Sequence, residues 1–193
     1  HPYMIPIVPA VIPVSKEDLL TQLERLAFTP ELHVDVVDGK FVPKVSWPCN
    51  PTGDPVALKN ELDTFTLEVD LMIENPLPAA VDWVTAGADM LVFHVETIDL
   101  ENFKNFCEFT HITISIASHG DTPVETLLEY AQFADGIQLM GIKQIGSQGQ
   151  PFDASVLDVI KKVKETYPEK PVTVDGSVNP DTIRRITDAG ADR

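Results

Sequence analysis

One histidine and three aspartates occupy matched positions on short apolar segments, where a parallel sheet would bring them together. On the segment 32–37, the two-residue repeat of a strand places His33 and Asp35 on one face. Asp70 lies on a second such segment, and Asp175 ends a third. Buried acids are rare unless they are paired or bind a metal. The four side chains therefore predict a site for a divalent cation such as Zn²⁺, Mn²⁺ or Fe²⁺.

Each of these residues also has a simpler interpretation when taken alone. Asp175 precedes a glycine and could belong to a strand-ending turn. Asp70 could form an ion pair with a lysine. A further histidine, His94, stands on a neighbouring apolar segment and could be a hydrogen-bonded core residue. The prediction of a site rests on the joint occurrence of these residues at the ends of several strands.

The elements that would position these residues alternate along the chain. Short β-branched segments are separated by amphipathic stretches of helical length, which predicts βαβ units and a parallel sheet. Strands are expected at residues 5–11, 32–37, 64–73, 90–95, 112–117, 136–142 and 172–175. Helices are expected at residues 16–27, with Ser15 as N-cap, then at 76–87, 100–107, from 122 onward, and at 153–165 and 181–188, with a long loop at 39–55.

A repeated Ala-Gly-Ala-Asp sequence bears on the number of strands. Residues 86–89 lead from a helix into the fourth strand, and residues 189–192 follow the last expected helix. In each copy the glycine is expected to cap its helix in the left-handed conformation. By analogy an eighth strand begins near Arg193. We therefore predict one domain over residues 1–193, an α/β protein of the (β/α)₈ TIM barrel type that lacks its last strand and helix. The alternative is an open doubly wound sheet.

Composition narrows the classes of function. The 193 residues include 30 acidic and 14 basic ones, for a net charge of −16, which disfavours nucleic acid and anionic membranes as partners. The two cysteines, Cys49 and Cys107, show neither a disulfide framework nor a zinc motif, so we expect a cytoplasmic protein. Such a charge also repels phosphorylated substrates at long range. A phosphate site must then act locally, and the glycine-containing loop at 141–152 is a candidate.

The segment Leu32-His-Val-Asp-Val-Val-Asp-Gly-Lys-Phe-Val-Pro43 closely resembles the second-strand signature of the ribulose-phosphate 3-epimerase family. Further likenesses follow in chain order at residues 71–76, 93–96, 122–125, 149–152 and 174–179. The resemblance implies an isomerase of the pentose phosphate pathway that interconverts D-ribulose 5-phosphate and D-xylulose 5-phosphate with the help of a divalent metal ion. It also implies a sugar phosphate as small-molecule partner, and we expect a homo-oligomer.

The resemblance assigns roles to individual residues. Asp35 and Asp175 would exchange protons on opposite faces of sugar carbon C3. The metal would be held by His33, Asp35 and Asp175, with Asp70 at the position where the family has a second histidine. Substrate and phosphate contacts are implied for Met72, Met140, Gly146, Ser147, Gly149, Gly176 and Ser177.

Departures from the family pattern leave alternatives open. Asp70 makes the metal shell more negative, which favours a harder ion or marks a changed activity. Ala10 stands where a serine is usual, Ser177 replaces the second glycine of a pair, and the loop at 145–149 is one residue longer. The substrate could therefore be another ketose phosphate, such as a hexulose 6-phosphate. The chain could also be a catalytically weak sugar-phosphate-binding relative, or a barrel whose acids serve stability alone.

Overall fold

In the computed structural model, residues 7–143, 149 and 151–193 are described. Within these residues seven parallel strands pair in chain order to form one curved sheet, as the alternating pattern predicts. The strands are β1 (Ala10–Val11), β2 (Glu31–Val37), β3 (Thr66–Met72), β4 (Met90–His94), β5 (Thr113–Ala117), β6 (Gly136–Met140) and β7 (Val172–Asp175). The first strand is shorter than expected, since residues 7–9 are not in a strand.

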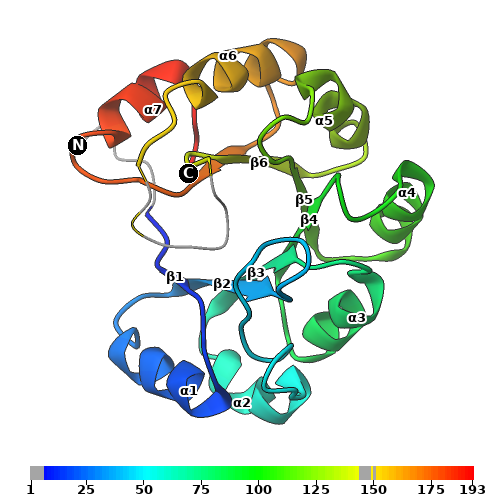
Figure 1. Ribbon diagram of the computed structural model, residues 1–193, viewed down its shortest axis with the longest axis vertical. Helices are drawn as coiled ribbons and strands as arrows, with labels where there is room; N and C mark the ends of the chain where they lie inside the picture. The colour runs from blue at the N-terminus through cyan, green and yellow to red at the C-terminus, as the bar shows by residue number, and fades with distance from the viewer. Residues whose placement is uncertain (1–6, 144–148, 150) are drawn as a thin grey trace.

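The helices lie on the outside of the curved sheet (Figure 1). They are α1 (Lys16–Arg25), the 3₁₀ helix η1 (Pro55–Leu58), α2 (Lys59–Leu62), α3 (Leu77–Thr85), α4 (Leu100–Phe109), α5 (Val124–Ala131), α6 (Val156–Thr166) and α7 (Ile183–Ala189). This arrangement of an inner parallel sheet and outer helices is that of a TIM barrel. The short elements η1 and α2 were not expected, because the proline- and glycine-rich segment before them indicates only a loop.

Several local predictions about helix ends can be compared with the structure. The side chain of Ser15 accepts a hydrogen bond from the backbone N–H of Asp18, so this N-cap is confirmed. Gly190 caps α7 with φ +115°, and Gly87 follows α3 with φ +105°, as the repeated sequence predicts. The prediction at α5 was wrong by one residue, because the helix begins at Val124 with Pro123, rather than Thr122, at its cap position.

The two faces of the sheet carry different side chains. On β2, Val34 and Val36 belong to the main core between the sheet and the helices. The alternate residues His33 and Asp35 are buried and line a cavity on the inner face. Val37 continues this inner face and packs in a small apolar cluster with Ile12, Val42, Met72 and Ile142. The two-residue repeat of β2 thus separates structural from polar positions, as predicted.

The register between β2 and β3 aligns the polar residues of the two strands. The Cα partner of His33 is Glu68, and the Cα partner of Asp35 is Asp70. Partners in adjacent parallel strands present their side chains on the same face of the sheet, about 4.8 Å apart. Backbone pairing alone therefore places four ionisable side chains in a compact square on the inner face.

At the other end of the sheet, the last residues of the chain pair with β7. The backbone N–H of Val174 donates to the carbonyl of Arg193 over 2.9 Å, and that of Asp192 donates to the carbonyl of Val172 over 2.8 Å. The expected start of a strand near Arg193 agrees with these bonds.

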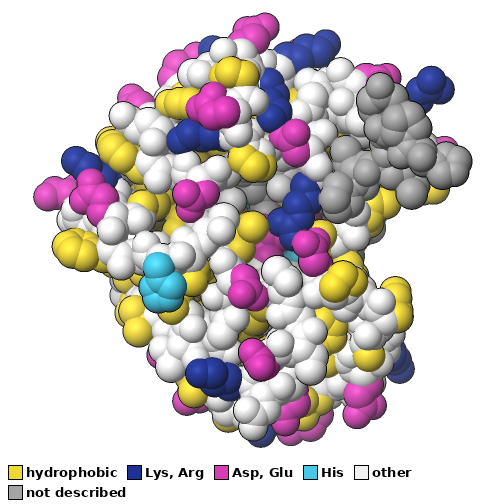
Figure 2. Space-filling view, turned by 180° about the vertical axis from the view of Figure 1, so that it is seen from behind, with side chains coloured by type: hydrophobic (Ala, Val, Ile, Leu, Met, Phe, Trp, Pro, Cys, Tyr) yellow, Lys and Arg dark blue, Asp and Glu magenta, His cyan; other side chains and the backbone are white. Residues whose placement is uncertain are grey.

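The surface carries the acidic excess of the sequence. Figure 2 shows acidic side chains spread over the back of the molecule, with fewer basic ones among them. Across the described part of the chain, no helix is both long enough and apolar enough to cross a membrane.

Candidate metal and acid–base site

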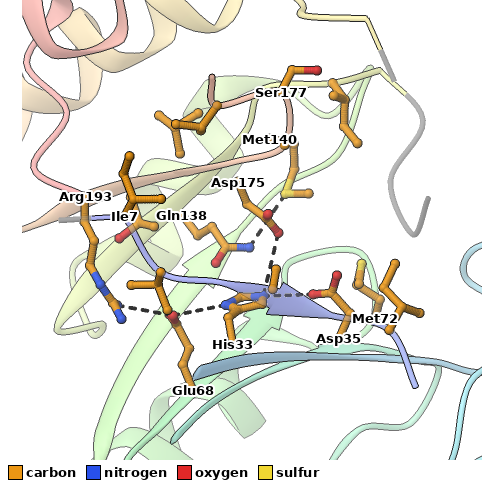
Figure 3. A pocket seen from close by; sticks show the side chains of 18 of the residues that line it. Ile7, His33, Asp35, Glu68, Met72, Gln138, Met140, Asp175, Ser177 and Arg193 are labelled. Atoms are coloured by element: carbon orange, nitrogen blue, oxygen red, sulfur yellow. Dashed lines mark hydrogen bonds and ion pairs between the residues drawn. The ribbon is translucent and has the colours of Figure 1, made fainter. Parts of the chain in front are cut away.

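Four side chains from three strands converge inside the barrel. They are His33 and Asp35 from β2, Asp70 from β3 and Asp175 from the end of β7, and one nitrogen or oxygen atom from each lies within 4.8 Å of the others. Figure 3 shows His33, Asp35 and Asp175 facing one another across the cavity. The structure thus brings together all four residues that were expected to bind a metal.

His33 stands at the centre of this cluster. Its Nε2 atom lies 2.8 Å from Oδ1 of Asp35, 3.7 Å from Oδ2 of Asp175 and 3.8 Å from Oδ2 of Asp70. Its Nδ1 atom, on the other side of the ring, lies 3.0 Å from Oε2 of Glu68. One edge of the imidazole therefore faces the three aspartates, and the other edge is held by a fourth carboxylate.

Asp70 is fully buried and hydrogen-bonded through both oxygens. Oδ1 lies 2.6 Å from Nε2 of His94 on β4, and Oδ2 accepts a hydrogen bond of 2.7 Å from the side-chain amide of Gln138 on β6. Among the described residues these two partners, rather than a lysine, satisfy the Asp70 carboxylate. His94 is the hydrogen-bonded core histidine that the simpler interpretation expected, and its partner is a residue of the site.

The backbone at the end of β7 brings Asp175 and the next turn close to β6. The carbonyl of Asp175 accepts a hydrogen bond of 2.7 Å from Gly141, and a Cβ atom on Gly141 would lie 2.4 Å from the carbonyl oxygen of Gly176. A side chain at position 141 would therefore push the two strands apart. Gly176 and Ser177 both have positive φ, at +96° and +53°, so the chain turns sharply beside the cavity.

Burial and the charges within the cluster shift the pKa values of His33 and Asp35. Burial by itself lowers the pKa of His33, but the charge and hydrogen bond of Asp35, together with Glu68, outweigh burial and leave the pKa well above its usual value. Burial raises the pKa of Asp35, and the neighbouring His33 opposes this only in part. The pair therefore holds a proton readily while no cation is bound.

The pKa values of Asp175 and Asp70 are shifted in opposite directions. Burial, followed by repulsion from Asp35, raises the pKa of Asp175 to about 7. Burial also favours the neutral form of Asp70, but His94 and then His33 outweigh it, so the pKa of Asp70 is lowered. Burial lowers the pKa of His94, yet Asp70 more than compensates and raises it. Asp70 and His94 thus form an ion pair, and Asp175 can exchange a proton near neutral pH.

The donor set fits a divalent cation. Ligands 2.0–2.2 Å from an ion lie at most about 4.4 Å apart, so donor atoms already within 4.8 Å of one another need only small shifts to bind one. Three carboxylates and one imidazole suit Mn²⁺, Fe²⁺ or Zn²⁺. The far ring nitrogen of His33 and both oxygens of Asp70 have hydrogen-bond partners, which orient these two side chains in the way that metal sites require.

The cluster opens into a cavity of about 290 Å³ at the carboxyl ends of the strands. Its lining includes five of the residues expected to contact substrate or phosphate, which are Met72, Met140, Gly149, Gly176 and Ser177. Ala10 also lines it. Gly146 and Ser147 lie outside the described residues. The cavity is large enough for a small phosphorylated sugar of a dozen or so heavy atoms.

Three residues near the site carry contacts that the sequence analysis did not assign. Glu68 and Arg193 form an ion pair of 3.2 Å beside His33, and Gln138 binds Asp70. Glu68 shares a face with Asp70, which is a signal visible in the sequence. The other two could not be recognised in advance, because Gln138 stands on an apolar strand 68 residues from its partner and Arg193 lies 125 residues from Glu68.

The family model and the curated relatives that match this chain name the same family. The model of the ribulose-phosphate 3 epimerase family matches residues 7–193. A ribulose-phosphate 3-epimerase of Bacillus subtilis is 32% identical over 168 residues, which are 83% of this chain and 74% of the relative. Its counterpart in Chlamydia muridarum is 30% identical over 170 residues, covering 83% of this chain and 72% of the relative.

Solved structures support the fold independently of sequence. A 3-keto-L-gulonate-6-phosphate decarboxylase of Vibrio cholerae superposes with a TM-score of 0.69 at 12% identity, covering 94% of this chain and 83% of the other. A phospho-2-dehydro-3-deoxyheptonate aldolase of Thermotoga maritima gives a TM-score of 0.61 at 14% identity, covering 97% of this chain and 58% of the other. At such low identity these likenesses bear on the architecture alone.

Proposed function

The chain belongs to the ribulose-phosphate 3-epimerase family and is therefore that of an epimerase, and from this premise we propose that it interconverts D-ribulose 5-phosphate and D-xylulose 5-phosphate. The observation that carries the proposal is the pair Asp35 and Asp175. These carboxylates come from β2 and β7, line one cavity and both approach Nε2 of His33, at 2.8 Å and 3.7 Å. Inversion at a carbon beside a carbonyl needs two such groups, one for each face of the carbon.

In the proposed reaction Asp35 and Asp175 share the proton transfers. One carboxylate removes the proton from C3, the electron pair left behind moves toward the C2 carbonyl, and an enediolate forms. The other carboxyl group then gives a proton to the opposite face of C3, which inverts that centre. In the metal-free protein, burial and the neighbouring Asp35 raise the pKa of Asp175 to about 7, so this carboxyl group holds a proton readily, and the reverse reaction exchanges the two roles.

We assign the cation to His33, Asp35, Asp70 and Asp175. When bound, a divalent ion supplies fixed positive charge that stabilises the negative charge developing on the substrate oxygens. Three carboxylates and a neutral imidazole leave the site with a net charge of about −1 around such an ion. The balance of oxygen over nitrogen donors favours a harder ion such as Mn²⁺ or Fe²⁺ more than a two-histidine shell would.

Methionine and backbone groups complete the proposed substrate site. Met72 and Met140 line the cavity near the acids and give the carbon chain of the sugar an apolar, polarisable surface. Gly176 and Ser177 turn at the end of β7, where backbone N–H groups can receive a phosphate. A second candidate is another ketose phosphate, such as a hexulose 6-phosphate, because Ala10 lines the cavity with a methyl group in place of the usual hydroxyl.

The test is an epimerisation assay of the purified protein with ribulose 5-phosphate and with a hexulose 6-phosphate, in the presence of Mn²⁺, Fe²⁺ or Zn²⁺. Exchange of the C3 proton in heavy water reports the first half of the reaction. Asp175→Asn should reduce turnover by about 10²–10⁴-fold, the range expected for loss of a general acid or base. The same change at the exposed residue Asp181 should have no effect. Absence of both turnover and exchange with every sugar and metal would refute the proposal.

A further inference from the structure

Glu68 is a buried carboxylate that the proposed reaction does not use. It is only 3% exposed, and its Oε2 atom contacts Nδ1 of His33. The three aspartates of the cluster lie near the other ring nitrogen, Nε2. Glu68 is therefore separated from the cation site by the full width of the imidazole, so it contacts the site through His33.

Arg193 provides the charge that a buried glutamate requires. Its Nη1 atom lies 3.2 Å from the same Oε2 atom of Glu68, and its Nη2 atom lies 3.3 Å from Oε2 of Glu31 on β2. The Arg193 side chain is itself only 18% exposed, which strengthens an ion pair relative to one at the surface. Figure 3 shows the resulting chain of contacts from Arg193 through Glu68 to His33.

These contacts determine which ring nitrogen of His33 is available to bind an ion. A carboxylate only accepts hydrogen bonds, so Nδ1 must carry the hydrogen that Glu68 accepts. When a cation displaces the hydrogen on Nε2, the imidazole remains protonated on Nδ1 and presents the lone pair of Nε2 to the ion. The same hydrogen bond restricts rotation of the ring, which would otherwise turn about its bond to the strand.

We propose that Glu68 and Arg193 are positioning residues that hold His33 in the tautomer and orientation needed to bind the cation. The inference rests on the cation site of the proposed function and extends it to two residues outside that site. It has particular weight in this chain because His33 is the one imidazole among the four assigned ligands. An error in its orientation cannot be compensated by a second ring.

The experiment compares Zn²⁺ affinity, measured by calorimetric titration, among variants of the pair. Zn²⁺ is chosen because it binds nitrogen and oxygen donors more tightly than Mn²⁺ and is diamagnetic. Glu68→Leu, which removes the acceptor, should weaken affinity by about 10–100-fold, the usual effect of losing such a partner. Glu68→Gln keeps an amide oxygen as acceptor, so its affinity for Zn²⁺ should fall less. The affinity of Arg193→Met should lie between those of the two Glu68 variants.

The matched control is Glu31→Gln, which removes the charge of the other partner of Arg193 without touching His33. It should change Zn²⁺ affinity by less than threefold. Long-range ¹⁵N–¹H spectra of histidine-labelled, Zn²⁺-loaded protein should show His33 protonated on Nδ1 in the wild type and in Glu68→Gln, with this signature weakened in Glu68→Leu. A merely structural role for Glu68 would not alter the tautomer.

The outcomes separate this inference from the proposed function. If Glu68→Gln and Glu68→Leu bind Zn²⁺ as the wild type does, or if Glu31→Gln weakens binding equally, the positioning role is overturned. Should Glu68→Leu fail to fold, the affinity of Glu68→Gln relative to Glu31→Gln decides the question. A wild-type protein that lacks epimerase activity but loses Zn²⁺ affinity on substitution of Glu68 would overturn the proposed reaction and support the positioning role.

Discussion

His94 and Asp70 are joined by a hydrogen bond of 2.6 Å between Nε2 and Oδ1, and both side chains are fully buried. The bond links β4 to β3 in the interior of the barrel. Since Gln138 occupies the other oxygen of Asp70, the carboxylate is held in one orientation from two sides. Asp70 therefore has partners that make its buried negative charge tolerable.

Removing His94 should destabilise the protein strongly. His94→Leu leaves the Asp70 charge buried with a single side-chain donor, and loss of one partner from a buried charged pair costs about 3 kcal/mol. Urea denaturation of the protein without added metal measures this change in the free energy of unfolding. His94→Gln, which can still donate a hydrogen bond, should recover part of the loss. The same leucine substitution at the exposed His111 should change stability by less than about 0.5 kcal/mol.

Substitution of Asp70 by histidine should change the preference among metals. Asp70→His replaces an oxygen donor by a nitrogen donor and reduces the negative charge of the proposed site by one. Affinity for Zn²⁺ should then rise relative to that for Mn²⁺ by about tenfold or more, because imidazole suits Zn²⁺ better. Competition titrations with the two ions measure this ratio. An unchanged ratio would show that Asp70 does not contact the ion.

The stability of the metal-free protein should depend on pH through Asp175. Its pKa of about 7 in the folded state exceeds the usual value of 3.8, so folding favours the protonated form. The stabilisation associated with that proton is complete below pH 3.8 and is lost as the pH rises through 7. Asp175→Asn cannot ionise, so its melting temperature should exceed that of the wild type by several degrees at pH 8 and match it at pH 4.

The control for this pH dependence is Asp181→Asn, at an exposed acid near the same end of the sheet. Its melting temperature should follow that of the wild type at every pH. Added Zn²⁺ should reverse the order at pH 8, because the ion binds the charged carboxylate and stabilises the wild type more than a variant that keeps three of the four ligands. A wild-type protein whose metal-free stability rises between pH 4 and pH 8 relative to Asp175→Asn would contradict the assigned direction.

Relief of backbone strain at Ser177 should stabilise the fold. Ser177 has φ +53°, in the left-handed region that costs a side-chain-bearing residue about 1 kcal/mol. Ser177→Gly should raise the melting temperature by about 2–4 °C in calorimetry, less any loss from the greater freedom of glycine in the unfolded chain. Asn75, with φ +48°, provides a comparison, since asparagine tolerates this region. Asn75→Gly should produce a smaller gain.

The order of strands and the positions of the four clustered residues could be predicted from sequence, because both depend on short-range patterns. Alternation along β2 is enough to place His33 and Asp35 on one face. Their convergence with Asp175 then follows from the rule that the carboxyl ends of parallel strands meet. The short helices η1 and α2 could not be predicted, since Pro55 and the residues before it resemble a loop.

The partners of the site could not be predicted for a different reason. Gln138 and Arg193 reach Asp70 and Glu68 only because the sheet curls and brings β6 and the end of the chain over β3. No local pattern in the sequence encodes that curvature. The hydrogen bond between His94 and Asp70 is an intermediate case, in which a core histidine could be expected but its partner could not.

The placement of the proposed ligands along the sheet has a mechanical consequence. His33, Asp35 and Asp70 belong to neighbouring strands whose ladder fixes their spacing, while Asp175 stands on β7, four strands beyond β3. A small change in the bending of the sheet would move Asp175 relative to the other three and leave their mutual distances intact. A cation held by all four side chains would link β2 and β3 to β7 across the barrel. Its affinity would therefore depend on distant changes that make the sheet stiffer or more flexible.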